Sequence, residues 1–104
     1  MPSVGTPITS GNWVVSEGKQ EEFIAAWTEL LRWSQKEFPD FGYAFLIQQA
    51  TDPKHFISVG EWNNRDTIME WRGHPEFPQK IGAAASLCDE FAGLDYNVVA
   101  AAEG

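Results

Sequence analysis

Residues 61–77, EWNNRDTIMEWRGHPEF, hold the densest group of side chains that could take part in chemistry. This stretch carries two tryptophans, two arginines and one of the two histidines of the 104-residue chain. His74 could transfer a proton, because the unperturbed pKa of imidazole lies near neutrality. The alternative is a histidine at a helix cap or on the surface.

Two further polar side chains are candidates for handling negative charge. Asn12 could aim an amide N–H at a developing oxyanion, or it could be a turn or bulge residue. Arg72 could hold an anionic substrate group, or it could form a surface ion pair. The nearby acids for such a pair are Asp66, Glu70 and Glu76.

Five tryptophans are many for a chain of this length. A buried indole needs a partner for its N–H, and tryptophan also favours interfaces. Trp62 is expected at a strand end and Trp71 on a short helix, where clefts for small molecules often open. Trp27, Tyr43 and Phe45 complete the predicted wall, with core or interface positions as the alternative.

Several classes of site and partner are excluded by composition. The single cysteine, Cys88, rules out a disulfide framework and a cysteine-based zinc cluster. The two histidines have no HxxxH spacing and no carboxylates at a matching spacing, so we expect no metal. The chain also has no Ser-His-Asp set and no phosphate-binding glycine loop. A net charge of −8 argues against nucleic acid and anionic membranes as partners. With no export signal or membrane span in the sequence, we expect a cytoplasmic protein.

The elements that must position these residues follow from periodicity. Apolar residues at helical spacing predict a helix over 19–38, and alternation predicts strands over 13–15, 41–50 and 55–62. Asn63 or Asn64 is expected to cap a short helix that ends at Gly73. A second helix is predicted from Pro75 to a C-cap at Gly93, followed by a strand over 94–100.

This order, β-α-β-β-(α-α)-β, is that of an α+β ferredoxin-like unit with a four-stranded antiparallel sheet. It forms a single domain over 1–104 with its core at about 8–100. Strand 41–50 is apolar on both faces, while helices can cover only one face of such a sheet. We therefore expect a homodimer in which two sheets pack face to face.

In the order and spacing of five short motifs, the chain resembles the antibiotic biosynthesis monooxygenase family of dimeric α+β barrels. The resemblance runs from Ile8 to Val99. The motifs are WVVSEG leading into EEFIAAW, FPDFGYAFL, the F-x5-W of Phe56 and Trp62, the W-x5-F of Trp71 and Phe77, and the final Y-x-V-V strand from Tyr96.

The resemblance implies one of two chemistries. One branch of the family oxidises phenols or quinols with O2 and no cofactor, and the other degrades haem. Trp71 occupies the position of the tryptophan in the haem branch, but the position of its haem-ligating histidine is Ile81. Asn12 lies about one residue away from the expected asparagine. We therefore expect no cofactor, haem included.

The sequence predicts a cofactor-independent monooxygenase-like protein that acts with O2 on a flat aromatic, phenolic or quinol-type molecule. The predicted catalytic residues are Asn12, Trp71 and His74. The predicted substrate-binding residues are Trp27, Tyr43, Phe45, Trp62 and Arg72. The alternatives are a non-catalytic protein that binds aromatic ligands and a haem-binding relative with a substituted ligand.

Overall fold

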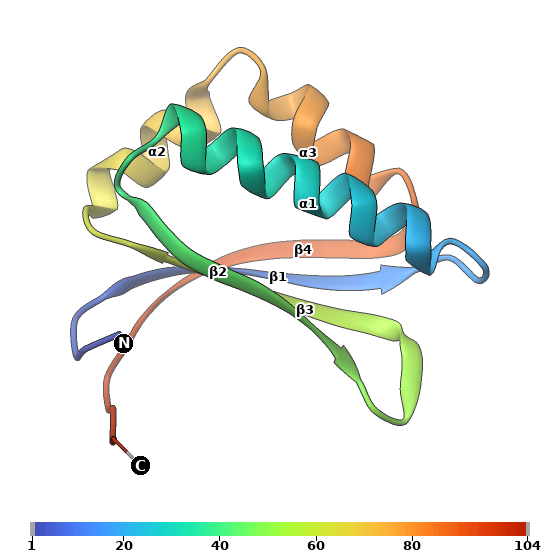
Figure 1. Ribbon diagram of the computed structural model, residues 1–104, viewed down its shortest axis with the longest axis horizontal. Coiled ribbons are helices and arrows are strands. Elements are labelled where there is room, and N and C mark those ends of the chain that lie inside the picture. The colour runs from blue at the N-terminus through green and yellow to red at the C-terminus, as the bar shows by residue number, and fades with distance from the viewer. Residues whose placement is uncertain (1, 104) are drawn as a thin grey trace.

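A four-stranded antiparallel sheet with three helices on one face makes up the fold (Figure 1). The computed structural model describes residues 2–103. The elements are β1 (Pro7–Val15), α1 (Gln20–Glu37), β2 (Phe41–Gln49), β3 (Asp52–Trp62), α2 (Arg65–Gly73), α3 (Phe77–Ala85) and β4 (Cys88–Asn97). The strand order is β2-β3-β1-β4, which confirms the predicted α+β ferredoxin-like fold. None of the helices in 2–103 is long and apolar enough to cross a membrane.

Local signals place most of these elements correctly. The apolar stripe of α1 buries Phe23 and Leu30 against the sheet, as its 3–4 spacing predicts. The side chain of Asn64 accepts a hydrogen bond from the backbone N–H of Asp66 at 2.9 Å, which confirms the predicted cap of α2. The first N–H groups of a helix have no acceptor within the helix, and the Asn64 side chain supplies one.

The predicted long final helix is wrong, because α3 ends at Ala85 and β4 begins at Cys88. The residues beyond the helix pair with β1, where Cys88 lies opposite Val15 and Phe91 lies opposite Trp13. The Phe91 ring stacks on Trp13 with 4.0 Å between ring centroids. This long-range pairing overrides the helical spacing of the apolar residues, and it also makes β1 longer than predicted.

Two groups of buried side chains lie between the sheet and the helices. One contains Trp13, Val15, Phe23, Phe56 and Ala84. The other contains Phe38, Trp62, Ile68 and Trp71. Each group contributes a tryptophan to the cavity described below.

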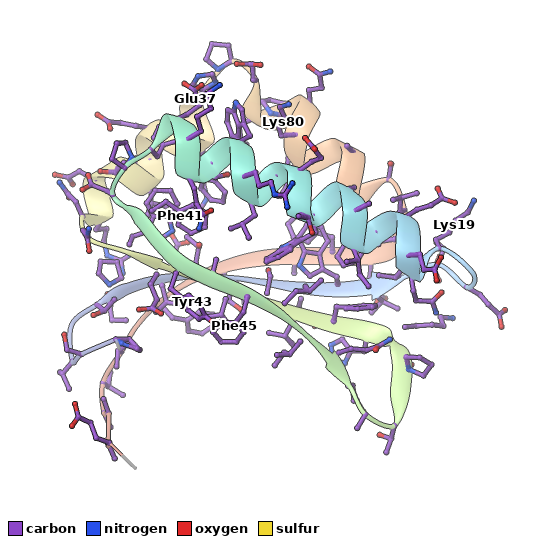
Figure 2. All side chains as sticks on the ribbon, in the orientation of Figure 1. Lys19, Glu37, Phe41, Tyr43, Phe45 and Lys80 are labelled. Atoms are coloured by element: carbon purple, nitrogen blue, oxygen red, sulfur yellow. The ribbon has the colours of Figure 1, made fainter. Side chains whose placement is uncertain are left out.

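The opposite face of the sheet carries no helix (Figure 1). An irregularity between Phe41 and Ala44 turns both of these residues toward the helices. Tyr43 and Phe45 therefore point to the uncovered face, as Figure 2 shows. We call this surface the open face. Its exposed apolar side chains are Tyr43 (66% exposed), Ile47 (51%), Leu94 (54%) and Tyr96 (50%).

Candidate active site

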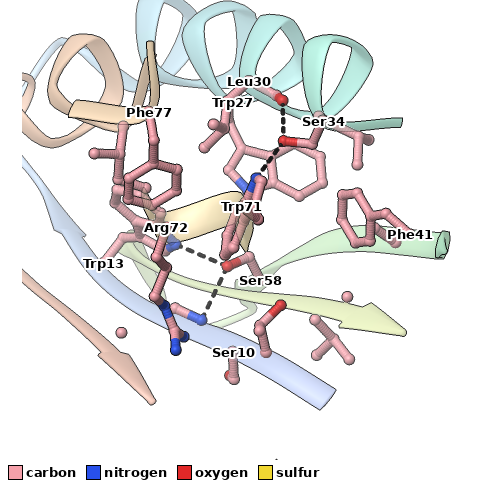
Figure 3. A pocket seen from close by; sticks show the side chains of 18 of the residues that line it. Ser10, Trp13, Trp27, Leu30, Ser34, Phe41, Ser58, Trp71, Arg72 and Phe77 are labelled. Carbon is pink, nitrogen blue, oxygen red and sulfur yellow. Dashed lines mark hydrogen bonds between the residues drawn. The ribbon is translucent and has the colours of Figure 1, made fainter. Parts of the chain in front are cut away.

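A cavity of about 90 Å³ lies between the helices and the sheet (Figure 3). Its roof consists mainly of aromatic and aliphatic side chains from the three helices: Trp27, Leu30, Trp71, Phe77 and Ile81. Its floor consists of small residues from all four strands: Thr9, Gly11, Ala44, Ser58, Gly60 and Gly93. A mostly apolar hollow with a few polar groups is the usual form of a small-molecule site.

Two glycines of the floor let neighbouring side chains pack directly over the strand backbone. A Cβ atom on Gly11 would lie 2.6 Å from Ser58 Oγ, and one on Gly60 would lie 2.6 Å from Phe41 Cε1. Real Cβ atoms do not approach other heavy atoms so closely, so larger residues would displace the side chains beside them. The absence of a side chain at both positions therefore shapes the floor.

Trp71 is fixed in the roof by a chain of two hydrogen bonds. Its indole Nε1–H donates to Ser34 Oγ at 2.9 Å, and the Ser34 hydroxyl donates to the carbonyl oxygen of Leu30 at 2.7 Å (Figure 3). Trp71 is only 8% exposed, and Ser34 is fully buried. Because each donor has an acceptor, the ring is held in one orientation at the cavity wall.

The tryptophans near the floor are fixed in the same way. Trp13 Nε1–H donates to Ser58 Oγ, and Trp62 Nε1–H donates to Thr9 Oγ1, both at 3.0 Å. Neither indole has appreciable exposure to solvent. Hydroxyls from β1 and β3 thus satisfy the N–H groups of both rings.

Arg72 extends from α2 to β4, and because this lining residue has a side chain that is 37% exposed, it marks a place where the cavity reaches solvent. Its Nη1 donates to Asp95 Oδ2 at 2.8 Å, and its Nη2 donates to Asp95 Oδ1. The guanidinium carbon also lies 5.8 Å from the centre of the Trp71 ring. The predicted alternative partners, all close in sequence, are wrong, because the acid that pairs with Arg72 lies 23 residues away on β4.

This ion pair shifts the ionisation of both partners. The hydrogen bonds from Arg72, aided by its charge, lower the pKa of Asp95 below its ordinary value of 3.8. The hydrogen bonds to Asp95 raise the pKa of Arg72. A positive charge therefore stays beside the opening across the working pH range, although Asp95 offsets much of it.

Three of the predicted site residues line the cavity: Trp27, Trp71 and Arg72. Trp62 lies next to it, bonded to Thr9 and stacked on Phe41 with 4.5 Å between ring centroids. This tryptophan lies beside the cavity on the helix-facing side of the sheet and is not part of the lining.

His74 lies outside the cavity, in the turn after α2. Its Nδ1 accepts a hydrogen bond from the backbone N–H of Glu76 at 3.0 Å. The ring meets Trp33 edge-on with 5.0 Å between centroids, and it meets Phe38 in the same manner. This placement matches the capping alternative and does not bring His74 together with Trp71 at the cavity wall.

The remaining predicted residues lie on the open face. Asn12 is exposed there, and its Oδ1 contacts His55 Nε2. Tyr43 and Phe45 project from β2 on the same side of the sheet (Figure 2). The sheet itself separates these three side chains from the cavity, so the predicted single group of site residues is divided between two faces.

Sequence reasoning missed the hydroxyl-bearing residues of the cavity lining, which are Thr9, Ser10, Ser34 and Ser58. A signal for two of them exists, because small residues recur at a spacing of two in Thr9-x-Gly11 and Ser58-x-Gly60. Side chains two apart on a strand share a face, so each pair marks a hollow in the sheet surface.

The described part of the chain offers little that could ligate a metal. Residues 2–103 contain no group of three or more His, Cys, Asp or Glu side chains placed to hold an ion. Ile81, at the position where the resemblance puts the haem-ligating histidine, lines the cavity with an aliphatic side chain. Neither His55 nor His74 is among the lining residues.

A sequence model of the antibiotic biosynthesis monooxygenase family matches residues 11–81 of the chain. No curated protein sequence matches it. Among solved structures, SnoaB from Streptomyces nogalater, a cofactor-independent oxygenase, is similar with a TM-score of 0.80 at 13% identity, covering 93% of this chain and 96% of SnoaB. A candidate antibiotic biosynthesis monooxygenase from Nitrosomonas europaea has a TM-score of 0.77 at 19% identity, covering 94% of each chain. At these identities, the structural similarity shows the fold alone.

Replacing Ser34 with alanine should destabilise the protein by about 1–3 kcal/mol, because the buried Trp71 N–H loses its acceptor. Urea unfolding measures the change in the free energy of unfolding. Thr28→Ala is the matched control, since Thr28 also donates to the carbonyl four residues earlier on α1 but receives no indole. Equal losses of stability in the two variants would show that the hydrogen bond from Trp71 to Ser34 contributes nothing to stability.

The ion pair between Arg72 and Asp95 should stabilise the fold in a pH-dependent way. Because the folded-state pKa of Asp95 is lowered, its contribution is complete above about pH 4 and is lost as the pH falls through that pKa. Both side chains are more than a third exposed, so we expect only about 0.2–1 kcal/mol at neutral pH. Urea unfolding should show that the wild type has a larger free energy of unfolding than Asp95→Asn, and that this difference shrinks only in acid. A difference that grows in acid would contradict this assignment.

Proposed function

Because the chain belongs to the antibiotic biosynthesis monooxygenase family, we propose that it is a cofactor-independent monooxygenase for a flat phenolic or quinol-type aromatic molecule. The observation that carries the proposal is the cavity walled by Trp27 and Trp71, with Arg72 at its opening. Flat rings suit a site with indole walls, and the guanidinium favours a ligand that carries or develops negative charge.

The reaction would convert an activated CH2 group flanked by aromatic rings into a carbonyl. Loss of a proton gives an electron-rich anion that can pass an electron to O2 directly. Recombination of the two radicals gives a peroxide, and loss of water from the peroxide gives the carbonyl. One oxygen atom of O2 enters the product and the other leaves as water, so atoms and electrons balance without an added reductant.

The residues at the cavity would assist this sequence mainly by binding and by electrostatics. The apolar roof excludes water, which strengthens the attraction between the substrate anion and Arg72. The lining residues in the described chain include no carboxylate or imidazole, so in this proposal the proton passes to water at the opening. The catalytic roles of Asn12 and His74 stay predictions, and each would have to act from outside the cavity.

A second candidate function is the binding of an aromatic ligand without turnover. The observation that favours it is this same lack of a proton acceptor in the lining. Quenching of tryptophan fluorescence by an aromatic ligand, with no consumption of O2, would support it. Haem binding with a substituted ligand is a weaker candidate, because Ile81 and the other lining residues offer no imidazole.

We also propose that the protein is a homodimer that buries the open face. Tyr43, Ile47, Leu94 and Tyr96 form an apolar surface there that would otherwise meet water. Such a surface suits packing against an identical sheet about a two-fold axis.

The oxygenase proposal predicts uptake of O2 when the protein, freed of metal by a chelator and dialysis, is mixed with anthrone or a substituted anthrone, whose CH2 group is flanked by two aromatic rings. Arg72→Met should lower kcat/KM at least about tenfold, because the substrate anion loses its counter-charge. Arg65→Met is the matched control. Arg65 also joins α2 to β4, through Tyr96 O and Asn97, but it does not line the cavity. No uptake above the buffer rate with any such substrate would refute the proposal.

The dimer proposal predicts a two-chain species in sedimentation velocity at micromolar concentration. Ile47→Lys should give monomers, because a charge on the open face would be buried without a partner. Met69→Lys is the control, since Met69 is 75% exposed but lies on α2. A well-folded wild-type monomer under these conditions would disprove the dimer.

A further inference from the structure

The hydroxyl of Ser58 has a bonding pattern that leaves only its hydrogen unused. Ser58 Oγ accepts from Trp13 Nε1 at 3.0 Å and from the backbone N–H of Gly11 at 3.0 Å (Figure 3). A serine hydroxyl has two acceptor lone pairs and one donor hydrogen. Both lone pairs are occupied, so in this arrangement Ser58 can act toward any third group only as a donor.

That hydrogen has no acceptor within the described residues. The only hydrogen-bond partners of Ser58 Oγ in residues 2–103 are the two donors, Trp13 and Gly11. Ser58 is only partly buried, and it belongs to the floor of the cavity. A donor that lines a mostly apolar hollow without an acceptor is unsatisfied until a ligand or water fills the space.

The surroundings of Ser58 preserve this arrangement. A Cβ atom on Gly11 would lie 2.6 Å from Ser58 Oγ, so any larger residue would push the hydroxyl away from its two donors. Trp13 is 2% exposed and is held between Phe23 and Phe91, so its N–H stays directed at Ser58. Two hydrogen bonds received by an oxygen also polarise its O–H, which makes that group a stronger donor.

The neighbouring hydroxyl of the floor differs in this respect. Thr9 Oγ1 accepts one hydrogen bond, from Trp62 Nε1. Its second lone pair is unused, so Thr9 can donate to a ligand or accept from one. Of the two floor hydroxyls that accept from an indole, Ser58 is therefore the one whose bonding selects a single kind of ligand atom.

We propose that Ser58 is a specificity-determining donor, and that the ligand places a phenolate or carbonyl oxygen of its flat ring system against the Ser58 hydroxyl. The inference rests on the proposed function, and it adds the group that recognises the substrate's oxygen. A donor stabilises an anionic oxygen more than a neutral one, so Ser58 lowers the pKa of a bound phenol. That shift makes the electron-rich anion, which reacts with O2, more abundant at neutral pH.

The test compares 1-naphthol with naphthalene, which has the same rings but no oxygen, by tryptophan quenching under nitrogen. The wild type should bind 1-naphthol about tenfold more tightly than naphthalene, and Ser58→Ala should abolish most of that preference. Ser58→Thr, which keeps a hydroxyl, should restore it. A preference that is absent in the wild type, or that is unchanged in Ser58→Ala, overturns the inference.

A second measurement needs no variant and so does not depend on the folding of Ser58→Ala, which leaves two donors without an acceptor. The absorption and fluorescence of 7-hydroxycoumarin distinguish its phenol from its phenolate. The pKa of the dye bound to the wild type should lie below that of the free dye by about one unit, a tenfold change. A bound pKa equal to or above the free value, or no binding at all, overturns the inference.

The binding test of Ser58 and the O2-uptake test of the oxygenase proposal can fail independently of each other. Binding under nitrogen involves no turnover, so a preference for 1-naphthol without any uptake of O2 refutes the oxygenase proposal and supports Ser58 as the donor. Uptake of O2 that persists unchanged in Ser58→Ala, together with equal binding of the two probes, supports the oxygenase and refutes the role of Ser58.

Discussion

Three buried indole N–H groups each donate to a hydroxyl, and the rest of the cavity depends on these bonds. Trp71 bonds to Ser34, Trp13 to Ser58 and Trp62 to Thr9. An indole without an acceptor would cost about 1–3 kcal/mol on burial, so each hydroxyl both stabilises the fold and fixes a ring. Trp33 Nε1 is the contrasting case, a buried donor with no partner in the described residues.

Glycines and small side chains on the strands make this arrangement possible. At Gly11 and Gly60 the side chains of Trp13, Ser58 and Phe41 pack directly over the strand backbone, and a hollow remains between this floor and the large rings of the roof. Empty apolar volume usually costs stability, because the surrounding atoms lose contacts. Its presence beside polar groups that can bind a ligand is the physical basis for treating the cavity as a site.

The two faces of the sheet serve different purposes. The face toward the helices carries the cavity and most of the buried side chains, while the open face exposes Tyr43, Ile47, Leu94 and Tyr96. Because adjacent residues of a strand project to opposite faces, neighbours in β2 such as Ala44 and Phe45 belong to different surfaces. Residues that lie close in sequence therefore need not share a site.

What the sequence alone determined was local. Periodicity and capping residues predicted α1, β2, β3 and α2 and, through their order, the α+β fold, because these signals act over a few neighbouring residues. The presence of Trp27, Trp71 and Arg72 at a pocket was also predictable, because indole rings commonly wall sites for flat molecules and a guanidinium commonly binds an anionic group.

Only the tertiary structure decided the features that depend on residues distant in sequence. Pairing with β1 made residues 88–91 a strand, and the same pairing brought Asp95 to Arg72. The position of the helices decided which sheet face holds the cavity, and so separated Asn12, Tyr43 and Phe45 from it. Spacing along a chain fixes how side chains alternate, but only the contacts between elements decide which surface each side chain faces.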